Sequence, residues 1–146
     1  MKFALDKSDV EQLLTHLQGA DADFIPPLST RLDLAAYAEK LVSHAHRIEA
    51  WDSQILAGCV AIYADNTAGV GFISNVSVLP SYQGRGLASQ LLKRALDLAV
   101  ELGLVRVRLE VHADNTAACT LYRRHGFQQD QSAILGANLI LERELT

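Results

Sequence analysis

The chain has 146 residues, a formal net charge of −4 and a charged content of 21%. This length suits one core, so we expect a single domain over residues 1–146. The acidic balance argues against a nucleic-acid-binding protein, which usually carries a basic surface. No apolar run approaches the roughly 20 residues that span a bilayer, and the N-terminus lacks a signal-peptide core. We therefore expect a cytoplasmic protein that binds neither nucleic acid nor membrane.

The two cysteines, Cys59 and Cys119, both lie among apolar residues. Their number and spacing match neither a disulfide framework nor a metal-binding motif. We expect two reduced, buried thiols and no metal.

The first part of the chain predicts two amphipathic helices. Residues Ser8 to Glu11 have the spacing of a capping box, an apolar stripe follows, and Gly19 ends the first helix. After a loop that contains Pro26 and Pro27, a second helix is expected over 32–45.

The rest of the chain alternates between predicted strands and helices. Strands are expected at 47–50, 55–64, 70–79, 105–112, 127–130 and 138–144. Further helices are expected at 87–102, ended by Gly103, and from Asn115, a good N-cap, to His125. This order predicts an α/β fold, with a central mixed sheet flanked by about four helices.

The turn after the strand at 70–79 is the most informative segment. The strand stops at Pro80, a glycine-bearing turn follows, and a long helix begins at Leu87. Free N–H groups and the dipole at a helix N-terminus favour an anion, and glycines let a phosphate approach the backbone. The spacing is neither that of the P-loop nor that of the dinucleotide fingerprint. The residues of this turn are Gln83, Gly84, Arg85, Gly86, Leu87 and Ala88.

This Gln-x-x-Gly-x-Ala pattern, with Val76 and Val78 on the strand before it, resembles the acyl-CoA loop of the GNAT acetyltransferase superfamily. A second block, in the order of the same family, supports the resemblance. It consists of Leu109, Glu110, Val111, Asn115, Leu121, Tyr122, Gly126 and Phe127.

The resemblance covers roughly residues 69–144 and implies a GNAT-like fold. The usual first strand of that fold is here either absent or reduced to residues 3–5. The resemblance implies an acetyl-CoA-binding core over 69–131 and an acceptor side in the helical region 1–50. The implied activity is transfer of an acetyl group from acetyl-CoA, as co-substrate, to the amine of a small molecule. We expect direct attack, because no well-placed Ser or Cys suggests a covalent intermediate.

The family also implies cofactor contacts. The residues of the turn would bind the pyrophosphate through backbone N–H groups, or the turn is only a surface turn that caps a helix. Arg85 is either a phosphate contact or a solvated side chain. The backbone of Val76 and Val78 would pair with the pantetheine arm as an added strand, and an N–H near Val78 would polarise the carbonyl. Asn115 would contact the cofactor while also capping its helix.

The sequence offers one candidate for the catalytic acid and several for the base. Tyr122 matches the family tyrosine that protonates the departing thiolate, and the alternative is a core tyrosine. The strand before the turn has no carboxylate, so the base must come from elsewhere. His112, with an ordinary pKa of about 6.5, is a candidate base or a surface histidine. Glu110 acts through water or pairs with Arg106 or Arg108, and a third alternative is that water alone carries the proton away.

The acceptor site is expected in the first half of the chain. Ser29, Arg31 and Tyr37 either frame a polar substrate or belong to a segment that packs two helices together. The sequence from Phe24 to Arg31 resembles a GNAT subgroup associated with surface-polysaccharide gene clusters, which implies an amino sugar or a sugar nucleotide as the acceptor.

Two other functions stay open. One is an acetyltransferase that acts on a protein or peptide amine, for which an acidic groove would be expected. The other is a non-catalytic CoA-binding sensor. GNAT relatives further imply a homodimer, with the strand at 138–144 as the candidate pairing edge.

Overall fold

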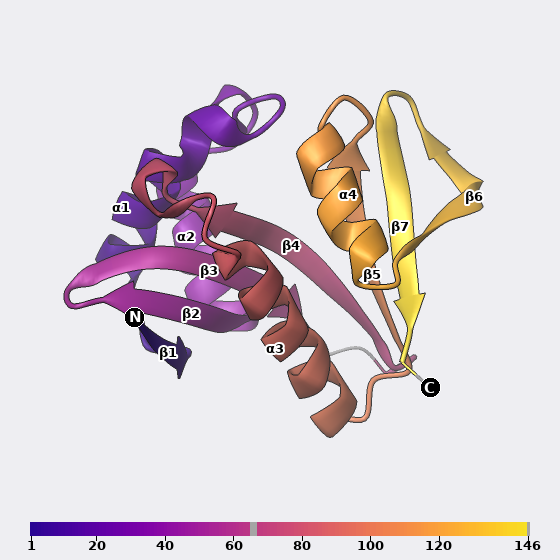
Figure 1. Cartoon of the computed structure of the whole chain (residues 1–146), viewed down its shortest axis with the longest axis horizontal. Helices are drawn as coiled ribbons and strands as arrows, with labels where there is room; N and C mark the ends of the chain where they lie inside the picture. The colour runs from indigo at the N-terminus through magenta and orange to yellow at the C-terminus, as the bar shows by residue number, and fades with distance from the viewer. Residues whose placement is uncertain (65–66, 146) are drawn as a thin grey trace.

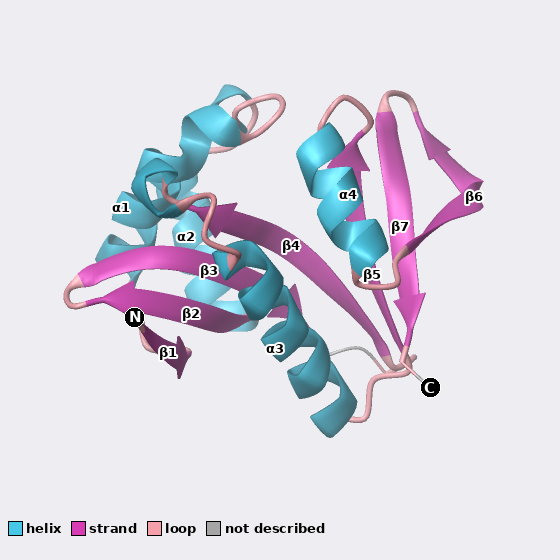
Figure 2. Ribbon diagram, viewed as in Figure 1, coloured by secondary structure: helices cyan, strands magenta, loops and turns pink. Residues whose placement is uncertain are grey.

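The structure, a computed structural model, describes residues 1–64 and 67–145, with the backbone alone for residues 132–135. Its strands form one mixed sheet, with α1 and α2 on one face and α3 and α4 on the other (Figures 1 and 2). This confirms the predicted mixed α/β fold, and the first strand is present as a short element. The elements are β1 (Lys2–Leu5), α1 (Val10–Ala20), α2 (Leu34–His44), β2 (His46–Asp52), β3 (Ile55–Tyr63), β4 (Val70–Val78), α3 (Leu87–Glu101), β5 (Arg106–His112), α4 (Thr116–Arg124), β6 (Gln128–Leu135) and β7 (Asn138–Glu144).

The sheet contains one parallel pair, and this pair is incomplete. The strand order is β1-β2-β3-β4-β5-β7-β6, and only β4 and β5 run parallel. Their ladder extends from Val70 opposite Arg106 to Ile73 opposite Leu109 and then stops. Beyond this point the two strands diverge, as Figure 1 shows. The C-terminal halves of both strands therefore face an opening instead of each other.

Apolar side chains form a separate core on each face of the sheet. Leu91 and Leu92 of α3 pack with Tyr122 and Phe127 on one face. Leu13 and Leu17 of α1 pack with Leu41 of α2 and with β3 on the other face. Two layers of helices thus fix the sheet between them, and the opening between β4 and β5 joins the two faces.

A β-bulge distorts β4 at the point where its ladder with β5 ends. Ala61 of β3 lies opposite Asn75 and Ile62 lies opposite Ile73, so Ser74 is an extra residue without a partner on β3. The Tyr37 hydroxyl of α2 donates a hydrogen bond to the Ser74 carbonyl at 3.1 Å. A bulge re-aims the side chains next to it, and here it directs Asn75 toward the face covered by α1 and α2.

The first helix is capped one residue later than predicted. Asp9 Oδ1 accepts the Gln12 N–H at 2.8 Å, and Gln12 Oε1 accepts the Asp9 N–H at 3.0 Å. Ser8 is buried instead and donates its hydroxyl hydrogen to the Glu49 carboxylate. Arg47 lies 3.4 Å from the same carboxylate, so this buried ion pair fastens the start of α1 to β2.

The place of β7 rules out the predicted pairing edge of a dimer. β7 lies between β5 and β6 and pairs with both of them. Both of its edges are occupied, so the prediction that residues 138–144 pair with a second copy is wrong.

The state of the cysteines and the character of the helices were both predicted from composition. Cys59 and Cys119 are free and buried, as predicted. Within residues 1–64 and 67–145, the helices lack the length and apolar character needed to cross a membrane.

Candidate active site

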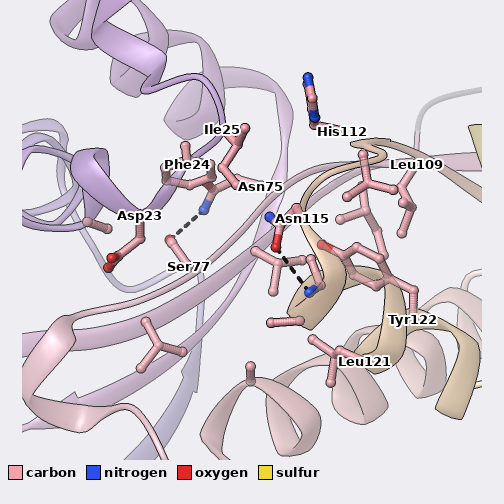
Figure 3. A pocket seen from close by; sticks show the side chains of 18 of the residues that line it. Asp23, Phe24, Ile25, Asn75, Ser77, Leu109, His112, Asn115, Leu121 and Tyr122 are labelled. Atoms are coloured by element: carbon pink, nitrogen blue, oxygen red, sulfur yellow. Dashed lines mark hydrogen bonds between the residues drawn. The ribbon is translucent and has the colours of Figure 1, made fainter. Parts of the chain in front are cut away.

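A cleft of about 760 Å³ opens where β4 and β5 separate. Figure 3 shows its walls: the segment after α1 on one side, β4 in the middle and α4 on the other. The cleft brings together most of the residues that the sequence singled out. Those residues are Arg31, Tyr37, Val76, Val78, Gln83, Gly84, Gly86, Leu87, Ala88, Glu110, His112, Asn115 and Tyr122.

Two predicted site residues do not line the cleft. Ser29 donates its N–H and its hydroxyl hydrogen to the Asp21 carboxylate, at 2.9 and 2.5 Å. Arg85 donates to the Ser81 carbonyl at 3.2 Å, and its guanidinium lies 5.3 Å from the centre of the Tyr82 ring. Both side chains are thus bound within their own loops.

The open edge of β4 presents backbone groups to the cleft. Leu79 donates its N–H to the Ala57 carbonyl at 2.9 Å, which marks a hydrogen-bonded pair of the β3–β4 ladder. Such pairs alternate along antiparallel strands, so the N–H and C=O groups of Val76 and Val78 point away from β3, toward β5. The Val78 carbonyl already accepts the Gln83 Nε2 hydrogen at 3.0 Å. Both groups of Val76 and the N–H of Val78 face the side where the β4–β5 ladder has ended.

The turn between β4 and α3 needs its glycines for their backbone angles. Gly84 and Gly86 have φ angles of +77° and +74°, and a Cβ at either position would meet no atom within 4 Å. The left-handed conformation, not crowding, therefore requires glycine here. Gly86 is the N-cap of α3 and no side chain caps the helix. The N–H groups of the first turn, with the helix dipole behind them, consequently form a site for an anion.

Hydrogen bonds hold this turn in place. The Gln83 amide donates to Asp23 Oδ2 at 2.9 Å as well as to Val78. Asn115 at the far wall accepts the Ala118 N–H at 3.2 Å and caps α4, as predicted. The Asn115 amide nitrogen is then left for a ligand in the cleft.

Tyr122 presents a protonated hydroxyl to the cleft. Its side chain is 8% exposed, and its ring meets Phe127 edge-on with 5.9 Å between ring centres. Burial raises the pKa of the Tyr122 hydroxyl, because the phenolate would lose its hydration. No hydrogen bond to this hydroxyl forms within the described part of the chain, and Figure 3 shows the ring beside Asn115. The group is therefore available as a proton donor.

Glu110 lies on the opposite face of the sheet from Tyr122. Its neighbours Leu109 and Val111 are buried in the core under α3 and α4, so Glu110 points toward the side of α1 and α2. It is the first residue of β5 beyond the ladder with β4. Asn138 Nδ2 donates to Glu110 Oε1 at 2.8 Å, and Glu110 lines the cleft.

The alternative pairing of Glu110 with the arginines of β5 is wrong. Arg106 pairs with Glu144 at 2.5 Å, and Arg108 pairs with Glu142 at 2.9 Å, both across the ladder to β7. Because these arginines pair with carboxylates of β7, Glu110 forms no ion pair with them, and it lines the cleft.

His112 is held by the turn that follows it. The Asp114 N–H donates to His112 Nδ1 at 3.1 Å. A neutral imidazole has one acceptor nitrogen, so the hydrogen of the ring lies on Nε2. The lone pair that would take a proton is already engaged.

Sequence reasoning missed a buried polar chain on β4. Asn75 and Ser77 line the cleft and connect to His16 of α1, which is 2% exposed. The available signal was three polar residues, Ser74, Asn75 and Ser77, in an otherwise apolar strand, and a histidine on the apolar face of the first helix. Among the described residues, no group of three or more His, Cys, Asp or Glu is placed to hold a metal ion.

The segment after α1 has features of both predicted roles, which are packing two helices together and framing a polar substrate. Leu28 is buried, as the packing interpretation predicts, while Arg31 and the exposed Ile25 and Leu32 border the cleft. Burial raises the pKa of Tyr37 to about 12, and its hydroxyl is held by the bulge in β4.

Comparisons with known proteins match this geometry. The model of the acetyltransferase (GNAT) family matches residues 12–127. N-alpha-acetyltransferase RimI of Mycobacterium tuberculosis is 40% identical over 98 residues, which are 65% of this chain and 60% of that protein. Mycothiol acetyltransferase of Corynebacterium aurimucosum is 40% identical over 65 residues, 44% of this chain and 21% of that protein. The structure of the PaiA N-acetyltransferase of Thermoplasma acidophilum, in complex with coenzyme A, has a TM-score of 0.74 at 17% identity and covers 99% of both chains.

The matches to curated relatives span only part of those proteins. The chain covers 30%, 60% and 38% of the length of the first three. The family match, by contrast, spans most of this chain and confirms the resemblance that the two sequence blocks indicated.

Proposed function

The chain belongs to the GNAT acetyltransferase family, and we propose that it transfers the acetyl group of acetyl-CoA to the primary amine of a small molecule. The opening between β4 and β5 carries this proposal. There an unpaired strand edge, Val76 to Val78, leads directly to the uncapped N-terminus of α3. A ligand with an amide-bearing arm and a phosphate at its far end fits this arrangement, because the arm would pair with the strand edge and the phosphate would meet the helix N-terminus.

The described residues fit coenzyme A at three places. The backbone of Val76 and Val78 would pair with the two amides of the pantetheine arm, as an added strand. The N–H groups at the start of α3 would bind the pyrophosphate, approached closely because Gly84 and Gly86 have no side chains. Asn115 would donate its free amide hydrogen from the far wall. In this proposal residues 69–131 form the cofactor core, and residues 1–50 form the acceptor side.

Tyr122 would act on the thioester from the face of α3 and α4. A backbone N–H near Val78 that the pantetheine arm leaves unpaired would polarise the carbonyl, and the Tyr122 hydroxyl would protonate the sulfur as it leaves. Attack by the amine would be direct. Neither buried cysteine lines the cleft, and burial raises the pKa of the Cys59 thiol far above the range in which a thiolate forms.

Glu110 is the base in this proposal. A primary amine with a pKa near about 10 must lose a proton before it attacks. Glu110 lines the cleft on the acceptor side and has one carboxylate oxygen held by Asn138, so the carboxylate would take the proton directly or through water. His112 would instead frame the site, because its acceptor nitrogen is bound by the Asp114 N–H.

The lining of the acceptor side favours a small molecule over a peptide. The acids on the cleft are Asp23 and Glu110, and Asp23 is bound to Gln83, while Arg31 and Arg124 supply positive charge. This is not the acidic groove expected for a basic peptide. An amine that also carries hydroxyl or anionic groups, such as an amino sugar, fits Arg31 and Tyr37. A peptide α-amine is the second candidate, supported by the N-alpha-acetyltransferase of M. tuberculosis.

A thiol-release assay tests this proposal. Acetyl-CoA is incubated with the protein and one of three probes: glucosamine, ethanolamine, or a tetrapeptide amide that begins with alanine. We expect release above the acetyl-CoA hydrolysis rate with a small amine, and product mass that shows one added acetyl group. Faster turnover of the peptide would favour the second candidate acceptor, a peptide α-amine. Binding of acetyl-CoA without release for any probe would favour the sensor.

A further inference from the structure

A chain of three hydrogen-bonded side chains crosses from α1 to the cleft. His16 Nδ1 lies 2.7 Å from the Leu56 carbonyl oxygen, and His16 Nε2 lies 2.8 Å from Ser77 Oγ. Asn75 Nδ2 lies 2.8 Å from the same Ser77 oxygen. His16 and Asn75 are each 2% exposed and Ser77 is 6% exposed, so water does not compete for these groups.

With a neutral His16 ring, only one arrangement of hydrogens satisfies this chain. A carbonyl oxygen accepts and never donates, so His16 Nδ1 must carry the hydrogen and Nε2 must accept one. Burial lowers the pKa of His16, which favours the same neutral ring. Ser77 therefore donates to His16, and its oxygen accepts from Asn75. The NH₂ group of Asn75 must face Ser77, which fixes its Oδ1 on the other side.

This arrangement leaves Asn75 Oδ1 buried without a partner. No described donor reaches it, although buried polar atoms are almost always hydrogen-bonded. The other such atom, the Tyr63 hydroxyl oxygen, belongs to a residue that does not line the cleft. Asn75 does line the cleft, as Figure 3 shows, so a donor on a bound molecule can complete its hydrogen bonds.

The face on which Asn75 lies indicates which molecule supplies that donor. Val76 and Val78 pack against the core of α3 and α4, and their backbone edges are those proposed to hold the pantetheine arm. The bulge at Ser74 directs Asn75 the other way, toward α1 and the segment that carries Phe24 and Ile25. Glu110, the proposed base, lies on this same side. An acceptor that enters from this side would therefore contact Asn75.

We propose that Asn75 Oδ1 accepts a hydrogen bond from the amine of the acceptor, and that Ser77 and His16 hold the amide in the required orientation. This inference rests on the proposed acetyl transfer to an amine. Asn75 binds one N–H of the protonated amine, and Glu110 takes the proton of a second N–H. The lone pair forms where that proton was, and rotation of the amine about its C–N bond then turns the lone pair toward the thioester carbonyl. Asn75 is then a binding residue, while Ser77 and His16 are positioning residues that never touch the acceptor.

Asn75→Leu tests the binding role, because the leucine side chain has the same number and branching of heavy atoms as asparagine and no polar atom. The best of the three amine probes is used, and acetyl-CoA affinity is measured by calorimetry on the same preparations. We expect kcat/KM for the amine to fall about tenfold or more, as for the loss of one hydrogen bond to a polar ligand. The Kd for acetyl-CoA should stay within about twofold, and Tm within about 4 °C, since only the bond to Ser77 is lost.

Two further variants separate binding from structure. Ser77→Ala frees the Asn75 amide to rotate and should raise KM for the amine less than Asn75→Leu does. Tyr63→Phe removes a buried hydroxyl oxygen that also has no partner among the described residues, from a residue that does not line the cleft, and should leave the kinetics unchanged.

Three results would overturn the inference. Unchanged amine kinetics in Asn75→Leu would show that Oδ1 meets no acceptor. A tenfold weaker Kd for acetyl-CoA with unchanged amine KM would assign Asn75 to the cofactor. If the unsubstituted protein turns over none of the three probes, the proposed function fails first, and the inference fails with it.

Discussion

Replacing Tyr122 with phenylalanine should remove catalysis while leaving the fold and the cofactor site intact. Phenylalanine keeps the buried ring and its edge contact with Phe127 at 5.9 Å between ring centres. The lost hydroxyl forms no hydrogen bond within residues 1–64 and 67–145. We therefore expect the free energy of unfolding to change by less than about 1 kcal/mol.

The catalytic effect should be much larger than the structural one. General acid catalysis contributes about 10²- to 10⁴-fold, which corresponds to roughly 2.7–5.4 kcal/mol of the activation barrier. In Tyr122→Phe, kcat for the best amine should fall by at least about 10²-fold. The Kd for acetyl-CoA should stay within about threefold, because the proposed cofactor contacts are the backbone of β4 and α3 and the Asn115 amide.

The assay is thiol release at saturating acetyl-CoA, with melting temperature and calorimetric Kd from the same preparation. A second readout is the pH dependence. Because burial raises the pKa of Tyr122 above its ordinary value of 10.0, the acid stays protonated and kcat should not decline toward pH 9.5. A Tyr122→Phe protein with kcat within threefold of the unsubstituted protein would refute Tyr122 as the acid. A matching loss of acetyl-CoA affinity would make it a binding residue instead.

Three other predictions concern the anion site, the base and pH. Gly86→Ala should lower the free energy of unfolding by about 1 kcal/mol or more, because its φ of +74° disfavours alanine, and it should weaken acetyl-CoA binding. The control is Gly103→Ala, at φ +77° beyond α3, which should lower the free energy of unfolding by the same amount but leave binding unchanged. Glu110→Gln should lower kcat at least about 10²-fold, whereas His112→Gln should change it less than about fivefold; the reverse order in thiol release would make His112 the base. The urea midpoint should fall as pH drops below 6.5, because the unfolded chain protonates His16 near its ordinary pKa while burial lowers the pKa of the folded residue. His16→Leu should flatten this dependence between pH 7.5 and 5.5, and an unchanged slope would exclude His16 as its source.

Local features of the chain were predictable because neighbouring residues determine them. The turn from Gln83 to Ala88, its two glycines and the helix at Leu87 follow from spacing over a few residues, and the structure has them in that order. The alternation of β5 likewise placed Glu110 and His112 opposite the buried face.

Features that depend on distant parts of the chain could not be predicted from the local sequence. The bulge at Ser74 arises from the register between β3 and β4, which no local pattern specifies. The bond between His16 and Ser77 joins residues 61 positions apart. The carboxylate of Glu49 is buried because Ser8, Arg47 and Trp51 surround it, and Ser8 itself looked like a helix cap. The pairing of β7 on both edges was also a property of the whole sheet.

The proposed cofactor site is tested most sharply by comparing acetyl-CoA with acetylpantetheine, which has the arm and the thioester but no pyrophosphate. Melting temperature is measured with each compound, and Kd by calorimetry. We predict that acetyl-CoA at about 100 times its Kd stabilises the protein by roughly 2.7 kcal/mol, raising Tm by several degrees. Acetylpantetheine should bind much more weakly, and Gly86→Ala should reduce the difference between the two. No shift at millimolar acetyl-CoA, or equal binding of both compounds, would contradict the assignment of the opening between β4 and β5 as the cofactor site.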